Sequence, residues 1–388
     1  MGRRIAVSSV LRNVPPALES GRLRVVDLDS GATLLSAPVP QSAHRSADPN
    51  PRGGLRGARG VSFTGDRFVL ANTERLFVFD RKWRMLSELS NSWTADIHEI
   101  LAEPDGIWVS CAACDLLLKL GWDGEVLASW SWRNDRSLVT EFGFDSLPEV
   151  QQRLDFRDPS QRGHAVHDVA HLNAVTRARD GLIVSLGRVL TPRAYRSRRL
   201  RRRIRHAATR ATITRPAMAA LARRHLSKIR ADPLPAPYRQ PGSSALVLMS
   251  DPTAAGATPP ARVVLRQDGL EVPNHNAGEV GGLLVYNDTN GGRLVAHDRQ
   301  NGSPPRLVDV PGNPSYARGL AWLGDETFVV GSQRPAALHT IDLAAGRVTS
   351  SVILGRDPWE CVSSVAVIPD SFDDPPQRLR FAPPAPGR

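Results

Sequence analysis

The chain has 388 residues, of which 41% are hydrophobic, and a formal net charge of +11 that resides in residues 193–230, where about 14 arginines and lysines and no acidic residue occur. It contains no apolar run of about eighteen residues that would span a membrane, no apolar core of a secretory signal near the N-terminus, and only three cysteines, too few for a disulfide framework. We therefore expect a cytoplasmic protein whose remaining sequence is mildly acidic, at roughly −3.

Three short apolar runs open the chain. Residues 5–10, 23–28 and 32–35 are rich in valine, leucine and isoleucine, as β-strands are. Because the last repeat unit of the chain is incomplete, we expect these runs to supply its missing outer strands. The two ends of the chain would then join in one sheet and leave no strand edge exposed.

A repeat of about 40 residues follows. Residues 58–66 and 317–325 both begin with Ala-Arg-Gly and end with Gly-Asp, and a second apolar run comes after each. The same register recurs near residues 98, 171, 275 and 361, and most copies lead into short strands bounded by glycine or aspartate. This period and content are typical of a propeller, in which each unit is one four-stranded sheet.

Two steps between repeats are longer than the others because each contains a segment that does not resemble a strand. These insertions cover residues of about 133–163 and about 192–241, and without them the spacing indicates six units. We predict an all-β fold, a six-bladed β-propeller formed by one domain over residues 1–370, with a proline-rich tail over 371–388 that is disordered from residue 374. A β-sandwich or two small β domains remain the alternatives.

The insertion at 192–241 is rich in arginine, alanine and leucine, which favour a helix, and Pro216 divides it into two pieces. One interpretation is a solvated helical excursion that covers one rim. Another is a contact through residues 193–230 with an anionic membrane surface or an acidic partner. Nucleic acid is disfavoured because Tyr195 is the only aromatic residue in the basic run. The insertion at 133–163 is predicted to be a lid or loop over the same end of the ring.

Propeller geometry makes the repeat register a candidate site, because the innermost strands all begin around a central channel. The register places at equivalent positions Arg59, His98, His171, His275, Arg318 and the pair Glu360 and Cys361. Three imidazoles at one axis can bind Zn²⁺, Fe²⁺, Cu²⁺ or Mn²⁺ and leave an open coordination position. Such histidines need orienting partners, for which the nearby candidates are Asp96, Asp168, Asn173, Asn276 and Glu279.

The predicted function is that of an enzyme acting on a small anionic molecule at the axis. His98, His171 and His275 are the candidate catalytic and metal-binding residues. The substrate's anionic group would be held by Arg59, Arg318, Asn173 and Asn276. A metal-free version, in which a histidine acts as acid or base, stays open, as does a polar plug or a non-catalytic scaffold that binds a ligand or an anionic partner. The reaction is undecided between hydrolase, lyase and transferase.

Two stretches carry a resemblance to known families. Residues 316–322 followed by 329–332, together with the His-Leu-Asn of 171–173, make the chain resemble a bacterial six-bladed β-propeller family of unknown function. The chain is also distantly similar to aryl-sulfotransferase-like propellers, in which a His-x-Asn segment belongs to the active centre. That similarity implies that His171 carries a sulfuryl group and that Asn173 assists it.

Overall fold

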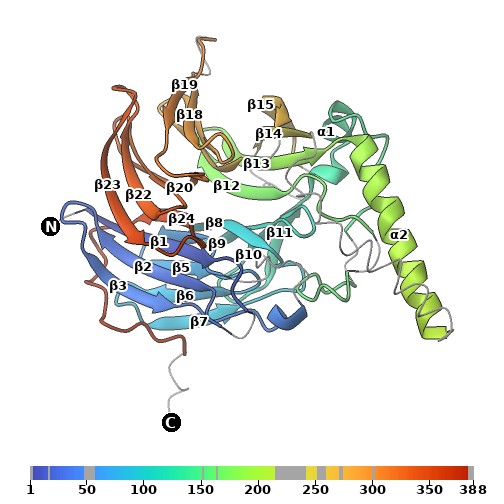
Figure 1. The fold of residues 1–388 in the computed structure, drawn as a ribbon, viewed down its shortest axis with the longest axis horizontal. Helices are drawn as coiled ribbons and strands as arrows, with labels where there is room; N and C mark the ends of the chain where they lie inside the picture. The colour runs from blue at the N-terminus through green and yellow to red at the C-terminus, as the bar shows by residue number, and fades with distance from the viewer. Residues whose placement is uncertain are drawn as a thin grey trace.

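A computed structural model shows six four-stranded antiparallel sheets arranged in a ring (Figure 1). It describes residues 3–15, 18–47, 57–150, 153–162, 165–214, 242–250, 259–270, 274–298 and 302–382. The predicted all-β, six-bladed β-propeller is confirmed. Neighbouring innermost strands contact one another around the whole ring and so enclose the axis.

Each blade is a meander of four strands. The blades are numbered 1 to 6 in the order in which their innermost strands occur in the chain, and the strands of each blade are given below from the axis outward. The innermost strands are β4 (Val61–Thr64), β8 (Ile97–Glu103), β12 (Leu172–Ala178), β16 (His275–Val280), β20 (Arg318–Gly324) and β24 (Glu360–Val367). The second strands are β5 (Arg67–Ala71), β9 (Gly106–Cys111), β13 (Gly181–Leu190), β17 (Leu283–Asp288), β21 (Thr327–Gly331) and β1 (Arg4–Leu11). The third strands are β6 (Leu76–Asp80), β10 (Leu116–Leu120), β14 (Gly242–Met249), β18 (Arg293–Asp298), β22 (Ala336–Asp342) and β2 (Gly21–Asp27). The outermost strands are β7 (Met85–Leu89), β11 (Val126–Trp130), β15 (Ala261–Leu270), β19 (Arg306–Asp309), β23 (Arg347–Gly355) and β3 (Thr33–Pro38).

The sixth blade joins the two ends of the chain, as predicted. β24 supplies its innermost strand, and β1, β2 and β3 supply the other three. A buried ion pair crosses this junction, because Nη1 of Arg24 lies 2.5 Å from Oε1 of Glu360. Ser9 Oγ donates to the same carboxylate at 2.6 Å. The ring therefore closes through backbone pairing and one buried charge pair.

The apolar core lies between the faces of neighbouring blades, where the inward residues of the strands meet. Between blades 6 and 1 it is aromatic, and it extends into the C-terminal tail. The ring of Phe381 packs edge-on against Phe77 and Phe79, with centroids 5.2 and 5.7 Å apart, and Phe372 is buried. The expectation of a disordered tail is therefore wrong up to residue 382, because these rings cover apolar surface of blade 1. Residues 383–388 lie outside the described residues.

Both insertions leave the ring at the end where the innermost strands begin. The first joins β11 to β12 and contains the short helices η2 (Trp132–Asn134) and α1 (Arg136–Glu141). The second joins β13 to β14 and begins with the predicted helix, α2 (Pro192–Thr214), which lies outside the ring (Figure 1). The second helical piece predicted after Pro216 lies outside the described residues. Among the residues described, no helix combines the length and the apolar character that crossing a membrane requires.

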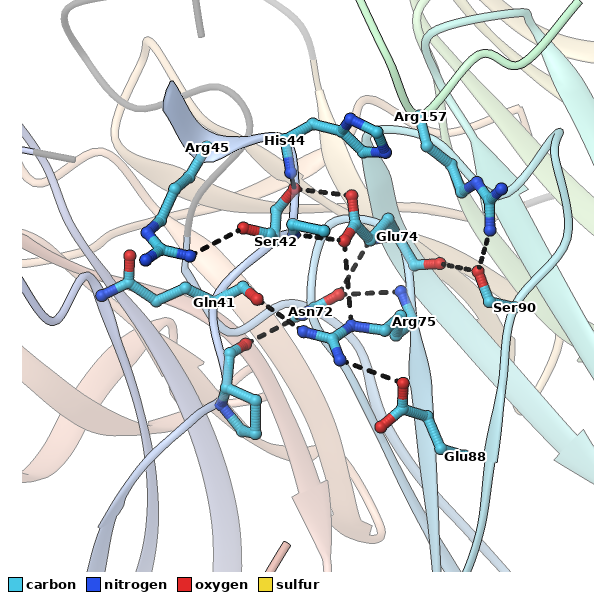
Figure 2. A network of polar contacts seen from close by, with 12 residues as sticks. Gln41, Ser42, His44, Arg45, Asn72, Glu74, Arg75, Glu88, Ser90 and Arg157 are labelled. Atoms are coloured by element: carbon cyan, nitrogen blue, oxygen red, sulfur yellow. Dashed lines mark hydrogen bonds and ion pairs between the residues drawn. The ribbon is translucent and has the colours of Figure 1, made fainter. Parts of the chain in front are cut away.

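A polar network ties the first insertion and the sixth blade to blade 1 at this same end (Figure 2). The buried Glu74, in the loop between β5 and β6, accepts from Ser42 Oγ at 2.5 Å and from the backbone N–H of Ala43 at 2.7 Å. Arg157 of the insertion donates to Ser90 Oγ at 2.9 Å, and Ser90 donates to the carbonyl of Glu74 at 3.1 Å. The insertion thus reaches from the junction of blades 2 and 3 across to blade 1.

Candidate functional site

Three histidines from consecutive blades meet at the axis. His98 lies in β8, His171 precedes β12, and His275 begins β16. One ligand atom from each ring lies within 4.8 Å of the others. The ring centroids of His98 and His171 are 4.8 Å apart, and those of His98 and His275 are 5.5 Å apart. The predicted convergence of the three imidazoles is confirmed.

The structure corrects the prediction that these histidines occupy equivalent positions of their blades. The first inner-strand residue paired with the second strand is Ile97 in β8, Leu172 in β12, His275 in β16 and Arg318 in β20. His98 therefore lies one residue after this position, and His171 lies one residue before it. Each of these strands has a bulge directly after the first pair, which re-aims side chains locally. The three imidazoles thus come from three successive positions: one residue before the first pair, the first pair itself, and one residue after it.

Arg318 lies between two of the imidazoles. Its Nη2 donates to Nδ1 of His98 at 3.1 Å and also to Nε2 of His275. On the other side of His275, Nδ1 lies 2.8 Å from Oγ1 of Thr289, whose hydrogen is donated to the carbonyl of Ala317 at 2.9 Å. A hydroxyl has a single proton, so Nδ1 of His275 carries the ring proton and Nε2 offers its lone pair. The lone pairs of His98 and His275 therefore converge on one nitrogen atom.

His98 is held neutral by its surroundings and is oriented by Asp96, on the side of the ring opposite Arg318. Burial and the nearby charges of His171, Arg318 and other cations lower the pKa of His98 well below its usual value of 6.5. Its Nε2 lies 3.7 Å from Oδ1 of Asp96, which is also 3.8 Å from Nη2 of Arg59. A neutral imidazole with an orienting carboxylate is the form in which histidine binds a metal.

His171 is positioned by two carboxylates and by the first insertion. Its Nδ1 lies 3.5 Å from Oδ1 of Asp168. The backbone N–H groups of residues 169–170 donate to Oδ2 of Asp115 at 2.7 and 2.8 Å. Asp115, in the loop between β9 and β10, is itself 3.6 Å from the guanidinium of Arg133, and both side chains are fully buried. Burial opposes ionisation of Asp168, but the charges of His171 and nearby arginines hold its pKa below the usual range.

A third arginine, which sequence reasoning missed, belongs to the same end of the axis. Burial lowers the pKa of Arg162, and the charges of Asp96 and Asp168 act against that shift. Nη2 of Arg162 and Nε of Arg318 are buried N–H groups with no hydrogen-bond acceptor among the residues that the structure describes. A buried donor without an acceptor costs about 1–3 kcal/mol. An anion at the axis would supply acceptors to both guanidinium groups.

The two asparagines predicted to bind substrate are engaged within the protein. Asn173 is fully buried, and its Nδ2 donates to the carbonyl of Asn274 at 2.6 Å. Asn276 donates to Glu99 and accepts from the backbone N–H of Gly319 at 2.7 Å. Both amides therefore connect neighbouring blades. Their role toward a substrate stays a prediction.

The sixth predicted member of the ring is not part of the centre. Glu360 pairs with Arg24 in the outer part of blade 6, and the thiol of Cys361 is buried against the backbone of Val362. The prediction that this pair lines the axis is wrong, because β24 begins earlier relative to its partner than the other inner strands. In β24 the bulge lies between Val362 and Ser364, so Val362 occupies the position that Arg318 occupies in β20.

Thr289, Asp115 and Arg162 were not found from the sequence. Thr289 belongs to the polar turn after β17, and Asp115 follows Cys-Ala-Ala-Cys between β9 and β10. Both lie in loops that connect the second and third strands, at the end where the inner strands begin. This position in the repeat could have identified Thr289 and Asp115 as candidates, because every loop between a second and a third strand borders the channel entrance.

Comparisons with known proteins support the fold alone. No family model and no curated protein matches the chain. Among solved structures, a protein of unknown function from Bacteroides caccae is similar over 95% of this chain and 99% of its own, with a TM-score of 0.51 and 11% identity. A structure of the nidogen–laminin complex is similar over 94% of this chain and 98% of the matched chain, with a TM-score of 0.50 and 8% identity. The chain thus shares its fold with propeller-like proteins, and the similarity to aryl-sulfotransferase-like propellers stays a prediction.

Proposed function

We propose that this propeller is an enzyme that binds a divalent transition metal through His98, His171 and His275 and acts on a small anionic substrate at the axis. The observation that carries the proposal is the convergence of two imidazole lone pairs on one point, with a third imidazole beside them. Three histidines suit Zn²⁺, Fe²⁺, Cu²⁺ or Mn²⁺. Such a metal would activate water or polarise an oxygen of the substrate.

Arg318 has two roles in this proposal. Its Nη2 now takes the two lone pairs that a metal ion would use, so the guanidinium competes with the metal. With a metal bound, Arg318 would be free to bind the anionic group of the substrate together with Arg162 and Arg59. Their planar N–H groups bind carboxylate, phosphate or sulfate in pairs.

A metal-free mechanism is the second candidate, and one observation favours it. His98 is neutral and buried and accepts from Arg318, so it can take a proton from a substrate while the arginines stabilise the resulting negative charge. A non-catalytic scaffold is the third candidate. In it, the same residues would only bind an anion.

Metal analysis of the purified protein separates these candidates. We expect about one equivalent of transition metal per chain after incubation with Zn²⁺, Fe²⁺, Cu²⁺ or Mn²⁺ and gel filtration, measured by mass spectrometry. His98→Ala should weaken binding by about 100-fold or more, since even residues behind the ligands change affinity by 10–100-fold. His297→Ala is the matched control, because His297 stacks on Tyr286 in blade 4, away from the centre.

Two results would contradict the metal centre. One is a folded wild-type protein that retains none of the four metals. The other is equal metal retention in His98→Ala and His297→Ala, with unchanged circular dichroism. If metal is absent but sulfate or phosphate binding is lost in Arg318→Gln, the metal-free candidates remain.

We also propose that helix α2 contacts an anionic surface, either a membrane or an acidic partner. Its arginines at positions 193, 196, 199 and 201–203 are exposed, and Leu200 and Ile204 are 59% and 55% exposed on the same helix. Residues four apart lie on one face of a helix. The apolar pair flanked by guanidinium groups supports binding to a lipid surface.

A further inference from the structure

The axial channel continues beyond the histidines into a second compartment. A cavity of about 230 Å³ lies between the inner strands, past the layer formed by Glu99 and Asn276. Its far end is lined by Trp322, whose side chain is 51% exposed. No residue of the histidine centre lines this cavity. It is therefore a separate compartment on the same axis.

The walls of the cavity combine aliphatic and polar side chains. Val61, Val175 and Leu320 supply branched aliphatic surface, and Ser62 and Thr176 add hydroxyl groups. A cavity with apolar surface and a few convergent polar groups can bind a small molecule. Among its lining residues there is no lysine and no arginine. An anionic ligand would find no partner there.

Glu99 is the polar group at the inner end of the cavity. Its Oε2 accepts from Ser364 Oγ at 2.9 Å and its Oε1 accepts from Nδ2 of Asn276. A carboxylate offers about four acceptor positions, so each oxygen keeps a second one. No cation of the described residues lies within ion-pairing distance of it, and the nearest influence is the charge of Arg318. Glu279 adds a second carboxylate to the lining.

We infer that this cavity is a binding site for a small primary amine with an apolar body, whose ammonium group pairs with the carboxylate of Glu99. The aliphatic side chains of the wall contact the body of the ligand, and burial of that surface drives its entry. The carboxylate of Glu99 forms a stronger, charge-assisted hydrogen bond with an ammonium group than with a neutral group of the same shape. The acidic lining excludes anions, so this ligand differs in charge from the substrate proposed at the histidines.

Benzylamine and benzyl alcohol are the probes, because they have the same body and differ in the head group. We expect the wild-type protein to bind benzylamine about tenfold or more tightly than benzyl alcohol, measured by isothermal titration calorimetry. Glu99→Gln keeps the shape of the side chain and should abolish the preference for the amine. Gly278→Leu places a side chain against Thr176 of the cavity lining and leaves Glu99 in place, so it should abolish binding of both probes.

The inference is overturned if wild-type protein binds neither probe, or binds both equally. It is also overturned if Glu99→Gln or a folded Gly278→Leu variant binds benzylamine as the wild type does. His98→Ala separates this site from the metal centre. That variant should lose the metal and keep benzylamine binding, and loss of benzylamine binding there would contradict two separate compartments.

Discussion

The two ends of the axial channel are built from the same six inner strands, yet they differ in chemistry. At the end where the strands begin, three imidazoles and the guanidinium groups crowd together, and loops from other parts of the chain hold them. Two or three residues further along the strands, the lining combines aliphatic side chains with a few polar ones and comes from the strands alone. Glu99 and Asn276 form the boundary. The difference shows that the histidine end, called here the polar end, depends on long-range support, whereas the other end needs only the ring.

Removing Asp115 should break the polar end with the largest effect. Asp115→Ala leaves the buried Arg133 without a carboxylate and with backbone carbonyls as its hydrogen-bond acceptors. It also removes the acceptor of the backbone N–H groups of residues 169–170. Loss of one member of a buried ion pair costs about 3–5 kcal/mol. We expect that loss in the free energy of unfolding by urea denaturation, and weaker metal binding because the segment before His171 is released.

Benzylamine binding in the channel should persist in folded Asp115→Ala protein. Asp66→Ala is a suitable control, because Asp66 lies in the exposed turn between β4 and β5. Equal effects of the two substitutions on stability and on metal binding would show that the loops do not support the histidine centre.

Removing Arg318 should convert the polar end into a better metal site. In Arg318→Met the metal no longer displaces hydrogen bonds from a charged donor, each of which contributes about 1.5–3 kcal/mol. We expect metal affinity to rise about tenfold or more, measured by competition with a chelator. Binding of sulfate or phosphate should fall in the same variant. Weaker metal binding would mean that Arg318 supports the centre and does not compete with the metal.

The two ends should respond oppositely to pH. The pKa of Glu99 is raised from 4.5 to about 8, so between these values the folded state binds the proton more tightly and the free energy of unfolding falls as pH rises. The pKa of His98 is lowered below 6.5, so its contribution is present above that value and is lost as pH falls below it. Urea denaturation from about pH 5 to about pH 8 should show that Glu99→Gln gains stability relative to the wild type as pH rises. A constant difference would contradict the burial of a protonated Glu99.

The features that could be predicted from the sequence also differ from those that could not, because the former depend on the repeat and the latter on contacts between distant segments. The ring, its closure by the two chain ends and the convergence of His98, His171 and His275 follow from a repeat whose spacing is visible in the chain. The register within one residue was not predictable, because bulges are set by pairing between strands. The roles of Thr289 and Asp115 were not predictable either, since their contacts join segments separated by up to 55 residues, and nothing local in the sequence specifies them. Glu99 follows His98 directly, but its isolation from cations depends on the packing of the whole channel.

The smallest effect on the ring should come from the outer helix. Arg199→Gln combined with Leu200→Ser changes two exposed residues of α2, and such surface substitutions stay within about 0.5 kcal/mol of wild-type stability. Metal and benzylamine binding should be unchanged, because α2 lies outside the ring. Binding to vesicles with anionic lipid, measured by co-sedimentation, should fall several-fold, because a basic side chain near an anionic surface contributes about 1 kcal/mol. The matched control is Arg347→Gln with Ile353→Ser, which removes one exposed arginine and one exposed apolar side chain from β23. If the α2 double variant and the β23 double variant bind vesicles equally well, α2 does not contact the lipid and is only a solvent-exposed helix.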